Sequence, residues 1–355
     1  MAALLAALAL LVAACGGGSG DTESSESAEE TAAASEEETS EAESEASSEE
    51  PSEEGSESES AAAGGDYSIT LIQGVAGDNF YISMECGAQA AAEELGATLD
   101  VQGGDEFSPT AQLPILEAVI AEGPDAILIA PTDTQALQAP IQAAVDAGIV
   151  VVLVDTTLDD PSIAVSAIAS DNVEGGRLAA EALAELMGEE GAALVVNVNP
   201  GISTTDQREQ GFAEAIAEYP NITYLPQQFS NNEPSRAAEI VSATLAAEPE
   251  LKGIFGTNLF SAEGAATGLR QAGAEGVSIV GFDAGPEQVA QLEEGLVQAL
   301  IAQQPNEIGR QGVEQAVSAL NDEDVEAEIS TGYSTITADN LEDPEIQEAL
   351  YVAEC

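Results

Sequence analysis

The stretch Ile149-Val150-Val151-Val152-Leu153-Val154-Asp155 is a continuous apolar run that ends in a carboxylate. A strand with one solvent-exposed face alternates apolar and polar residues. A strand of a parallel sheet is covered on both faces and is apolar throughout. Residues 149–155 therefore predict a buried parallel strand. Parallel strands need long crossover connections, usually helices, so helical segments should flank this run.

The sequence around this run repeats the same alternation from Tyr67 onward, with Gly, Pro or Asp between segments. Further strands are expected at 68–73, 98–102, 126–130, 163–168, 192–197, 222–225, 253–256, 277–282 and 296–302. Helices are expected at 83–95, 110–121, 134–147, 172–187, 206–218 and 235–247. This order predicts an α/β fold with doubly wound parallel sheets. The alternation continues over about 270 residues, which is more than a single hydrophobic core usually holds, so two lobes are expected.

The charge of the chain is strongly negative, with 66 Asp and Glu residues against 6 Lys and Arg. Residues 21–60 contain 17 of the 66 acids and no Val, Ile, Leu or aromatic residue, which predicts a disordered acidic tether over 15–66. The remaining acids make the folded part acidic too, which argues against nucleic-acid partners and anionic membrane surfaces. Salt should stabilise such a fold by screening its self-repulsion.

The first residues end in Leu11-Val12-Ala13-Ala14-Cys15, followed by a Gly-rich stretch. The pattern resembles a lipoprotein signal and is too short to span a bilayer as a helix. It predicts a signal peptide at 1–14 and lipidation of Cys15. The protein is then expected on the outer face of the cytoplasmic membrane, attached through its lipid anchor only. The alternative is an apolar N-terminal helix with a chance cysteine.

The other two cysteines are Cys86 and Cys355. In an oxidising compartment they predict a disulfide that pins the C-terminal tail to the first helix of the domain. Two unrelated thiols are the alternative. The chain has no histidine and no P-loop motif, which excludes His-dependent catalysis and His-ligated zinc. No cofactor and no metal site are expected.

Eight local motifs occur in a characteristic order: GDNFY (77–81), PDAILIAPTD (124–133), AGIVVVLVD (147–155), SDN (170–172), REQGF (208–212), IFGTN (254–258), VGFD (280–283) and IAQQP (301–305). With them, the chain from about Tyr67 to Thr337 resembles the type I periplasmic sugar-binding proteins, the ribose- and galactose-binding family. The resemblance implies two Rossmann-like lobes joined by a three-segment hinge, with crossings near 169–171, 303–305 and 331–333. Ligand would lie in the cleft between the lobes.

The domain bounds follow from this resemblance. The N-terminal lobe is expected at 67–170 plus 304–332, and the C-terminal lobe at 171–303 plus 333–343. Residues 344–355 would form a C-terminal tail.

A sugar site needs aromatic walls and fixed polar partners. Phe80 and Tyr81, with Asp78 alongside, come between a strand and a helix, where a loop could present them as stacking walls. Packing in the core is the alternative. Asp155 and Asp283 each end an apolar strand, which predicts ligand acceptors or, alternatively, caps of turns.

Three further residues complete the expected site. The resemblance assigns Arg208 to the ligand, because a guanidinium can donate to two neighbouring hydroxyls; a surface ion pair is the alternative. Asn258 would contact ligand or cap the next helix. Gln303 falls at the hinge and could join the lobes and contact ligand.

Departures from the ribose-binding pattern bear on the substrate. Ala130 stands where that pattern has an asparagine, Thr156 where it has an arginine, and Asn232 where it has an aromatic wall. These departures argue against ribose itself and leave another monosaccharide or a linear polyol open.

The sequence thus predicts the extracytoplasmic solute-binding component of an ABC importer, a monomer that performs no chemistry. Its partners would be a sugar or polyol and an ABC permease with a separate ATPase. The alternative is a ligand-sensing module of the same fold for a chemoreceptor or sensor kinase. A sugar-responsive repressor is disfavoured, since residues 1–66 contain no basic residue.

Overall fold

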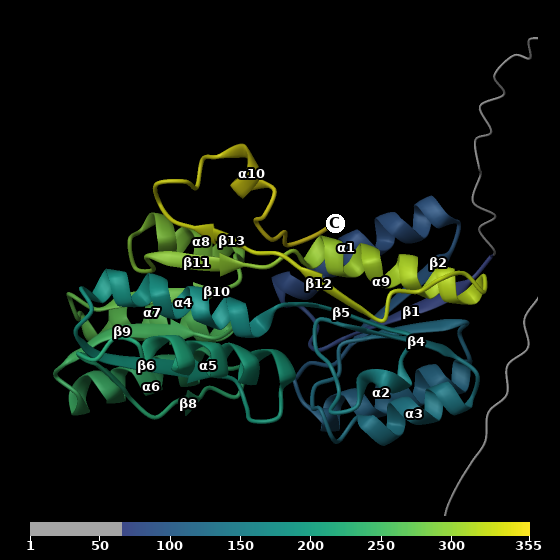
Figure 1. Cartoon of the computed structure of the whole chain (residues 1–355), viewed down its shortest axis with the longest axis horizontal. Coiled ribbons are helices and arrows are strands. Elements are labelled where there is room, and N and C mark those ends of the chain that lie inside the picture. The colour runs from purple at the N-terminus through teal and green to yellow at the C-terminus, as the bar shows by residue number, and fades with distance from the viewer. Residues whose placement is uncertain (1–65) are drawn as a thin grey trace, which may run out of the picture. The chain divides into compact units, whose positions relative to one another are not determined.

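The computed structural model describes residues 66–355 (Figure 1). The expected signal peptide, Cys15 and all but the last residue of the expected tether lie outside the described residues. None of the helices in the described part combines the length and the apolar character that a membrane span requires.

The first lobe is built on a six-stranded, wholly parallel sheet with the order β12-β5-β4-β3-β1-β2. Helices α1 and α9 cover one of its faces, and α2 and α3 cover the other (Figure 1). Its strands are β1 (Ser68–Gln73), β2 (Thr98–Gly103), β3 (Ala126–Ile129), β4 (Val150–Val154), β5 (Ser166–Ser170) and β12 (Glu328–Thr331). Its helices are α1 (Asn79–Leu95), α2 (Pro109–Glu122), α3 (Gln138–Asp146) and α9 (Pro305–Leu320).

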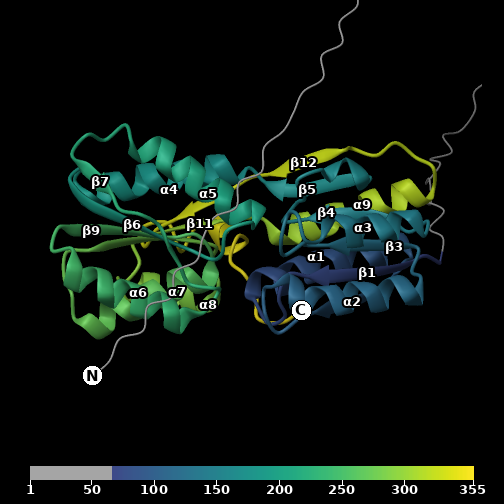
Figure 2. The ribbon, with the colours of Figure 1, turned by 90° about the horizontal axis from the view of Figure 1, so that it is seen from below.

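The second lobe repeats this plan with the strand order β13-β11-β10-β9-β6-β7, in which β13 is antiparallel to β11 and β8 pairs with β6. Helices α4 and α5 lie on one face, and α6, α7 and α8 on the other (Figure 2). Its strands are β6 (Gly191–Asn197), β7 (Ile222–Tyr224), β8 (Gln228–Phe229), β9 (Leu251–Gly256), β10 (Ser278–Phe282), β11 (Ala299–Ala302) and β13 (Ser334–Ile336). Its helices are α4 (Asn172–Met187), α5 (Ser203–Ile216), α6 (Pro234–Ala247), α7 (Leu259–Ala272) and α8 (Pro286–Glu293).

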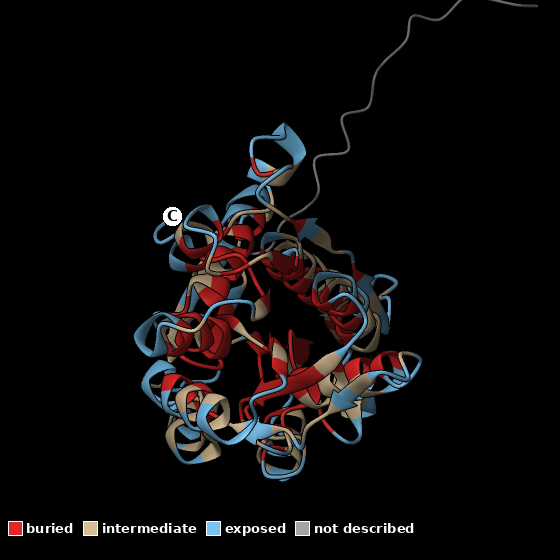
Figure 3. Cartoon of the chain, turned by 90° about the vertical axis from the view of Figure 1, so that its left-hand side faces the viewer, coloured by how far each residue is buried: buried red, intermediate tan, exposed pale blue. Residues whose placement is uncertain are grey.

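The α/β architecture with two parallel-sheet lobes is therefore confirmed. The chain passes from the first sheet to the second between β5 and α4, returns between β11 and α9, and crosses again between β12 and β13. The finer domain bounds given above stay a prediction. Buried residues gather on the strands and on the helix faces turned toward them (Figure 3).

Several local expectations were wrong. The helices expected at 134 and 206 begin at Gln138 and Ser203, and the strand expected at 296 begins at Ala299. The strand expected at 163 begins at Ser166, because Pro161–Ile163 form a 3-10 turn capped by Asp160. The helix expected at 83 begins at Asn79, where the Asp78 side chain accepts the Phe80 N–H as its N-cap. Phe80 and Tyr81 therefore lie in the first turn of a helix and not in a loop.

Candidate ligand-binding site

A cavity with about 400 Å³ of empty space, open solvent included, lies where residues of both lobes meet, at the carboxyl ends of their parallel strands. All eight residues singled out from the sequence line it: Asp78, Phe80, Tyr81, Asp155, Arg208, Asn258, Asp283 and Gln303. It is also lined by six that were not proposed as ligand contacts: Phe107, Val198, Ile202, Thr204, Thr205 and Asn232.

Two aspartates occupy corresponding places in the two lobes. Asp155 follows β4 and Asp283 follows β10, the third strand of each sheet in the order given above. Both have left-handed backbone conformations, with φ of 63° and 76°, which aspartate tolerates better than most side chains. Strained backbone of this kind persists where the surroundings hold it in place and is frequent at functional sites.

Each of these carboxylates is held by a hydroxyl or amide. Asp155 accepts a hydrogen bond of 2.7 Å from the Tyr81 hydroxyl. Asp283 accepts three, from the Leu259 N–H at 2.9 Å, the Gln303 Nε2 at 2.8 Å and the Tyr351 hydroxyl at 3.1 Å. The orientation of both carboxylates is therefore fixed before any ligand arrives.

Arg208 is the buried cation of this site, with 2% of its surface exposed. Its Nε donates to Asn172 Oδ1 at 2.8 Å and its Nη1 to the Thr257 carbonyl at 2.9 Å. The guanidinium carbon lies 3.7 Å from the centre of the Phe282 ring. Nη2 has no hydrogen-bond partner among the described residues. Since an unpaired buried donor is costly, Nη2 is suited to donate to a ligand in the cavity.

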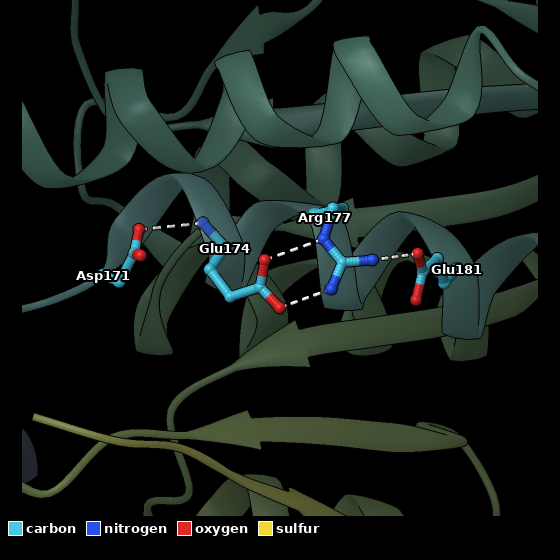
Figure 4. A network of polar contacts seen from close by, with 4 residues as sticks. All are labelled: Asp171, Glu174, Arg177 and Glu181. Carbon is cyan, nitrogen blue, oxygen red and sulfur yellow. Dashed lines mark hydrogen bonds and ion pairs between the residues drawn. The ribbon is translucent and has the colours of Figure 1, made fainter.

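The alternative considered for Arg208, a surface ion pair, was wrong, because the side chain is buried. Arg177 on α4 illustrates that arrangement, because it lies between Glu174 and Glu181 and pairs with both (Figure 4). Arg208 forms no ion pair with a carboxylate of the described residues. Its position depends on close packing of α4 and α5, since a Cβ at Gly176 would meet the Arg208 carbonyl oxygen.

The aromatic residues of the cavity come from the first lobe. Phe80 and Tyr81 are both buried and belong to the hydrophobic core while also lining the cavity, so the two interpretations considered for them coincide. The Tyr81 ring stacks on Phe107, with 6.5 Å between ring centres. Phe107 lies in an irregular stretch after β2 that carries no motif. In the second lobe the cavity is lined by Val198 and Ile202 in place of an aromatic wall.

Asn258 and Gln303 both have structural partners. Asn258 is the N-cap of α7, accepting the Ser261 N–H, and it donates to Asn232 Oδ1 at 2.7 Å. Gln303 lies where the chain leaves the second sheet; besides donating to Asp283 it accepts from the Ser170 hydroxyl at 3.0 Å. Gln303 thus connects the first crossing between the lobes to the carboxylate of the site.

Burial governs the protonation of the carboxyl groups here. Burial raises the pKa of Asp78 to about 8, and the nearby Asp283 carboxylate adds to this shift. Burial also raises the pKa of Asp155 to about 6, although the positive charge of Arg208 opposes the shift. Burial also raises the pKa of Asp283, again opposed by Arg208. Residues 66–355 contain no cluster of three His, Cys, Asp or Glu side chains arranged to hold a metal ion.

The tail is attached to this region by a disulfide. Cys86 on α1 and Cys355 are joined, with their Cα atoms 5.4 Å apart. This bond pins the C-terminal end of the chain to the first helix of the first lobe.

Comparison with known proteins points to one family. The family model described as "Periplasmic binding protein domain" matches residues 69–324. The ribose import binding protein of Escherichia coli is 32% identical over 268 residues, 76% of this chain and 90% of that protein. A solute-binding protein from Agrobacterium vitis, solved with α-D-tagatopyranose, is 45% identical, with a TM-score of 0.79 over 81% of this chain and 99% of that one. A second one from that organism, solved with D-fucose, is 29% identical, with a TM-score of 0.77 over 80% of this chain and 100% of that one.

Proposed function

We propose that this chain, which belongs to the periplasmic binding protein family, is the sugar-binding component of an ABC importer. It captures a monosaccharide or related polyol between its two lobes and delivers it to a membrane permease. It is a solute-binding protein and not an enzyme. Ligand that touches both lobes stabilises the closed arrangement, because only that arrangement satisfies both sets of contacts.

The observation that carries this proposal is the unpaired Nη2 of the buried Arg208, a residue that lines the cavity between the two lobes. Thr205 lines the same cavity, and its hydroxyl also lacks a partner among the described residues. Two unpaired donors beside the fixed carboxylates of Asp155 and Asp283 match the neighbouring hydroxyls of a sugar, each of which can accept and donate. Tyr81 and Phe107 supply the apolar wall on which a sugar ring could lie.

The eight lining residues predicted from the sequence are our proposed ligand contacts. The related structure with 45% identity contains D-tagatose, which supports hexoses as first candidates. Two further elements of the proposal rest on the sequence alone. We propose lipid anchoring through Cys15 at the outer face of the cytoplasmic membrane, and action as a monomer with a permease and a separate ATPase.

The test is a thermal-shift screen of pentoses, hexoses and polyols, with D-tagatose, D-fucose, D-arabinose, D-allose and D-ribose among the sugars, followed by recovery of the ligand. A bound sugar at about 1,000 times its dissociation constant should stabilise the fold by about 4 kcal/mol. Asp283→Asn, which keeps the shape and removes the charge, should abolish the shift. If no sugar or polyol of the panel shifts the melting temperature, or if the ligand is recovered chemically altered, the proposed function is wrong.

A further inference from the structure

The C-terminal tail connects the two lobes beside the binding cavity. It leaves the second lobe after β13, and the Tyr351 N–H donates to the carbonyl of Ala284, directly after Asp283, at 3.0 Å. The next residue, Val352, turns to α1 of the first lobe. Its N–H donates to the Ser83 hydroxyl at 2.9 Å, and its carbonyl accepts from Asn79 Nδ2 at 3.1 Å.

The disulfide makes the C-terminal tail a covalent link between the two lobes, in addition to the three chain crossings. Residues 352–355 are all exposed and bury little apolar surface, so packing alone would hold this end of the chain weakly. The bond from Cys355 to Cys86 fixes its course along α1. Tyr351 lies just before this exposed end.

Tyr351 is the buried member of the tail, with 5% of its surface exposed. Its ring lies edge-on to Phe80, with 5.9 Å between ring centres. Its hydroxyl donates to Asp283 Oδ1 at 3.1 Å and accepts the Gln303 N–H at 2.9 Å. Tyr351 is absent from the lining of the cavity and reaches the site through these two residues.

In each lobe a tyrosine hydroxyl donates to the aspartate of the site, but the two tyrosines come from different parts of the chain. In the first lobe, the helix after β1 supplies Tyr81, whose hydroxyl donates to Asp155. In the second lobe, the helix after the corresponding strand β6 places Arg208 in the cavity and offers no tyrosine to Asp283. Asp283 instead receives its tyrosine hydroxyl from the tail.

We propose that the disulfide-anchored tail contributes to ligand binding. In this proposal Tyr351 is a positioning residue, which holds the Asp283 carboxylate in the orientation that the ligand requires. The inference rests on the proposed function, because it takes Asp283 to be a ligand acceptor. The disulfide acts on ligand affinity by keeping Tyr351 in place.

Tyr351→Phe tests this role, because it keeps the ring against Phe80 and removes only the hydroxyl. We expect it to weaken binding of the tightest sugar of the panel, with D-tagatose tried first, about tenfold. This is the lower end of the range for loss of one hydrogen bond to a charged group, because Leu259 and Gln303 still donate to Asp283. Tyr224→Phe is the matched control. It removes a tyrosine hydroxyl that donates to Glu209 at 2.7 Å outside the cavity, and it should leave affinity unchanged.

The pair Cys86→Ser and Cys355→Ser should weaken binding to a similar extent. Adding Tyr351→Phe to that pair should then cost little more, since both changes remove the same contact and their effects should not add. Reduction of the unmodified protein with dithiothreitol should reproduce the loss, and the serine pair should not respond to it.

The pH profile separates positioning from loss of stability. The Tyr351 hydroxyl lowers the pKa of Asp283, so Tyr351→Phe should move the acidic loss of affinity to higher pH. Other charged or titratable groups facing Asp283 stay in place in this variant: Arg208 on α5, Asp78 before α1, Asp155 after β4, Glu263 on α7 and Tyr333.

The outcomes distinguish the two proposals. If the unmodified protein binds no sugar or polyol of the panel, the proposed function fails and this inference fails with it. If the unmodified protein binds sugar and Tyr351→Phe binds equally well with an unshifted pH profile, only the inference is wrong. Fully additive losses in the combined variant would also refute it, because the disulfide would then act by another route.

Discussion

Replacing Arg208 by lysine keeps the positive charge and removes the planar guanidinium, and it should weaken sugar binding about 10- to 150-fold. The range follows from losing one hydrogen bond with a charged donor, about 1.5–3 kcal/mol, at about 1.4 kcal/mol per tenfold change in affinity. The donor in question is Nη2, which has no protein partner among the described residues.

Lysine cannot replace the other contacts of this side chain. A single ammonium cannot reach Asn172 Oδ1, the Thr257 carbonyl and the cavity in the fork geometry of a guanidinium. The variant should therefore also lose unfolding free energy without ligand, up to about 3–6 kcal/mol if both hydrogen bonds of the charged guanidinium are lost at about 1.5–3 kcal/mol each.

Isothermal titration with the best sugar of the panel measures the first effect, and denaturant unfolding of the sugar-free protein measures the second. Arg236→Lys is the control, because Arg236 is exposed on α6 and its Nε donates to the Phe229 carbonyl at 2.9 Å, away from the cavity. An Arg208→Lys dissociation constant within about twofold of the original would refute the assignment of Nη2 to the ligand.

Three further predictions follow from burial, packing and charge. Burial raises the pKa of Asp78 from 3.8 to about 8, so between these values the folded chain holds a proton that the unfolded chain releases. Asp78 should therefore lower the free energy of unfolding as pH rises through this window, by up to about 1.4 kcal/mol per pH unit. Asp78→Asn, which keeps the helix cap, should remove this contribution from the slope in denaturant titrations. Gly176→Ala should force α4 and α5 apart, because the new Cβ would lie 1.9 Å from the Arg208 carbonyl oxygen. The expected cost is about 1–3 kcal/mol of unfolding free energy together with weaker sugar binding, and unchanged titration curves would contradict it. Finally, the melting temperature should rise between about 0.1 and 1 M salt as the acidic surface is screened, and a flat response in calorimetry would rule this out.

The fold could be predicted from the sequence because its strongest signals are local. The apolar run at 149–154 forms a buried parallel strand, as expected for a strand covered on both faces. The missed strands β8, β12 and β13 are short and lack such a run. Their pairing is decided by neighbours distant in sequence, which residue patterns do not reveal.

The candidate site was predictable to the extent that its residues sit at strand ends or in motifs. Asp155 and Asp283 end apolar strands, and parallel strands place such ends at one edge of a sheet. Phe107 lies in an irregular stretch, and Tyr351 lies in a tail without periodicity. For Tyr351 the sequence offered one indirect signal, the terminal Cys355, whose disulfide partner lies on the helix that carries Phe80 and Tyr81.

The distribution of the few cations separates the stability of this protein from its binding. Arg177, Arg270, Arg310 and Lys252 pair with glutamates at the surface, where salt screens such pairs. Arg208 alone among the basic residues is buried, and its partners there are neutral oxygens and an aromatic ring. An uncharged sugar brings no charge to this cavity, so its affinity should change little over the salt range that raises the melting temperature. A steep salt dependence of affinity would instead indicate that a charged solute is the ligand, because only a charged partner gains or loses screened attraction as salt is added.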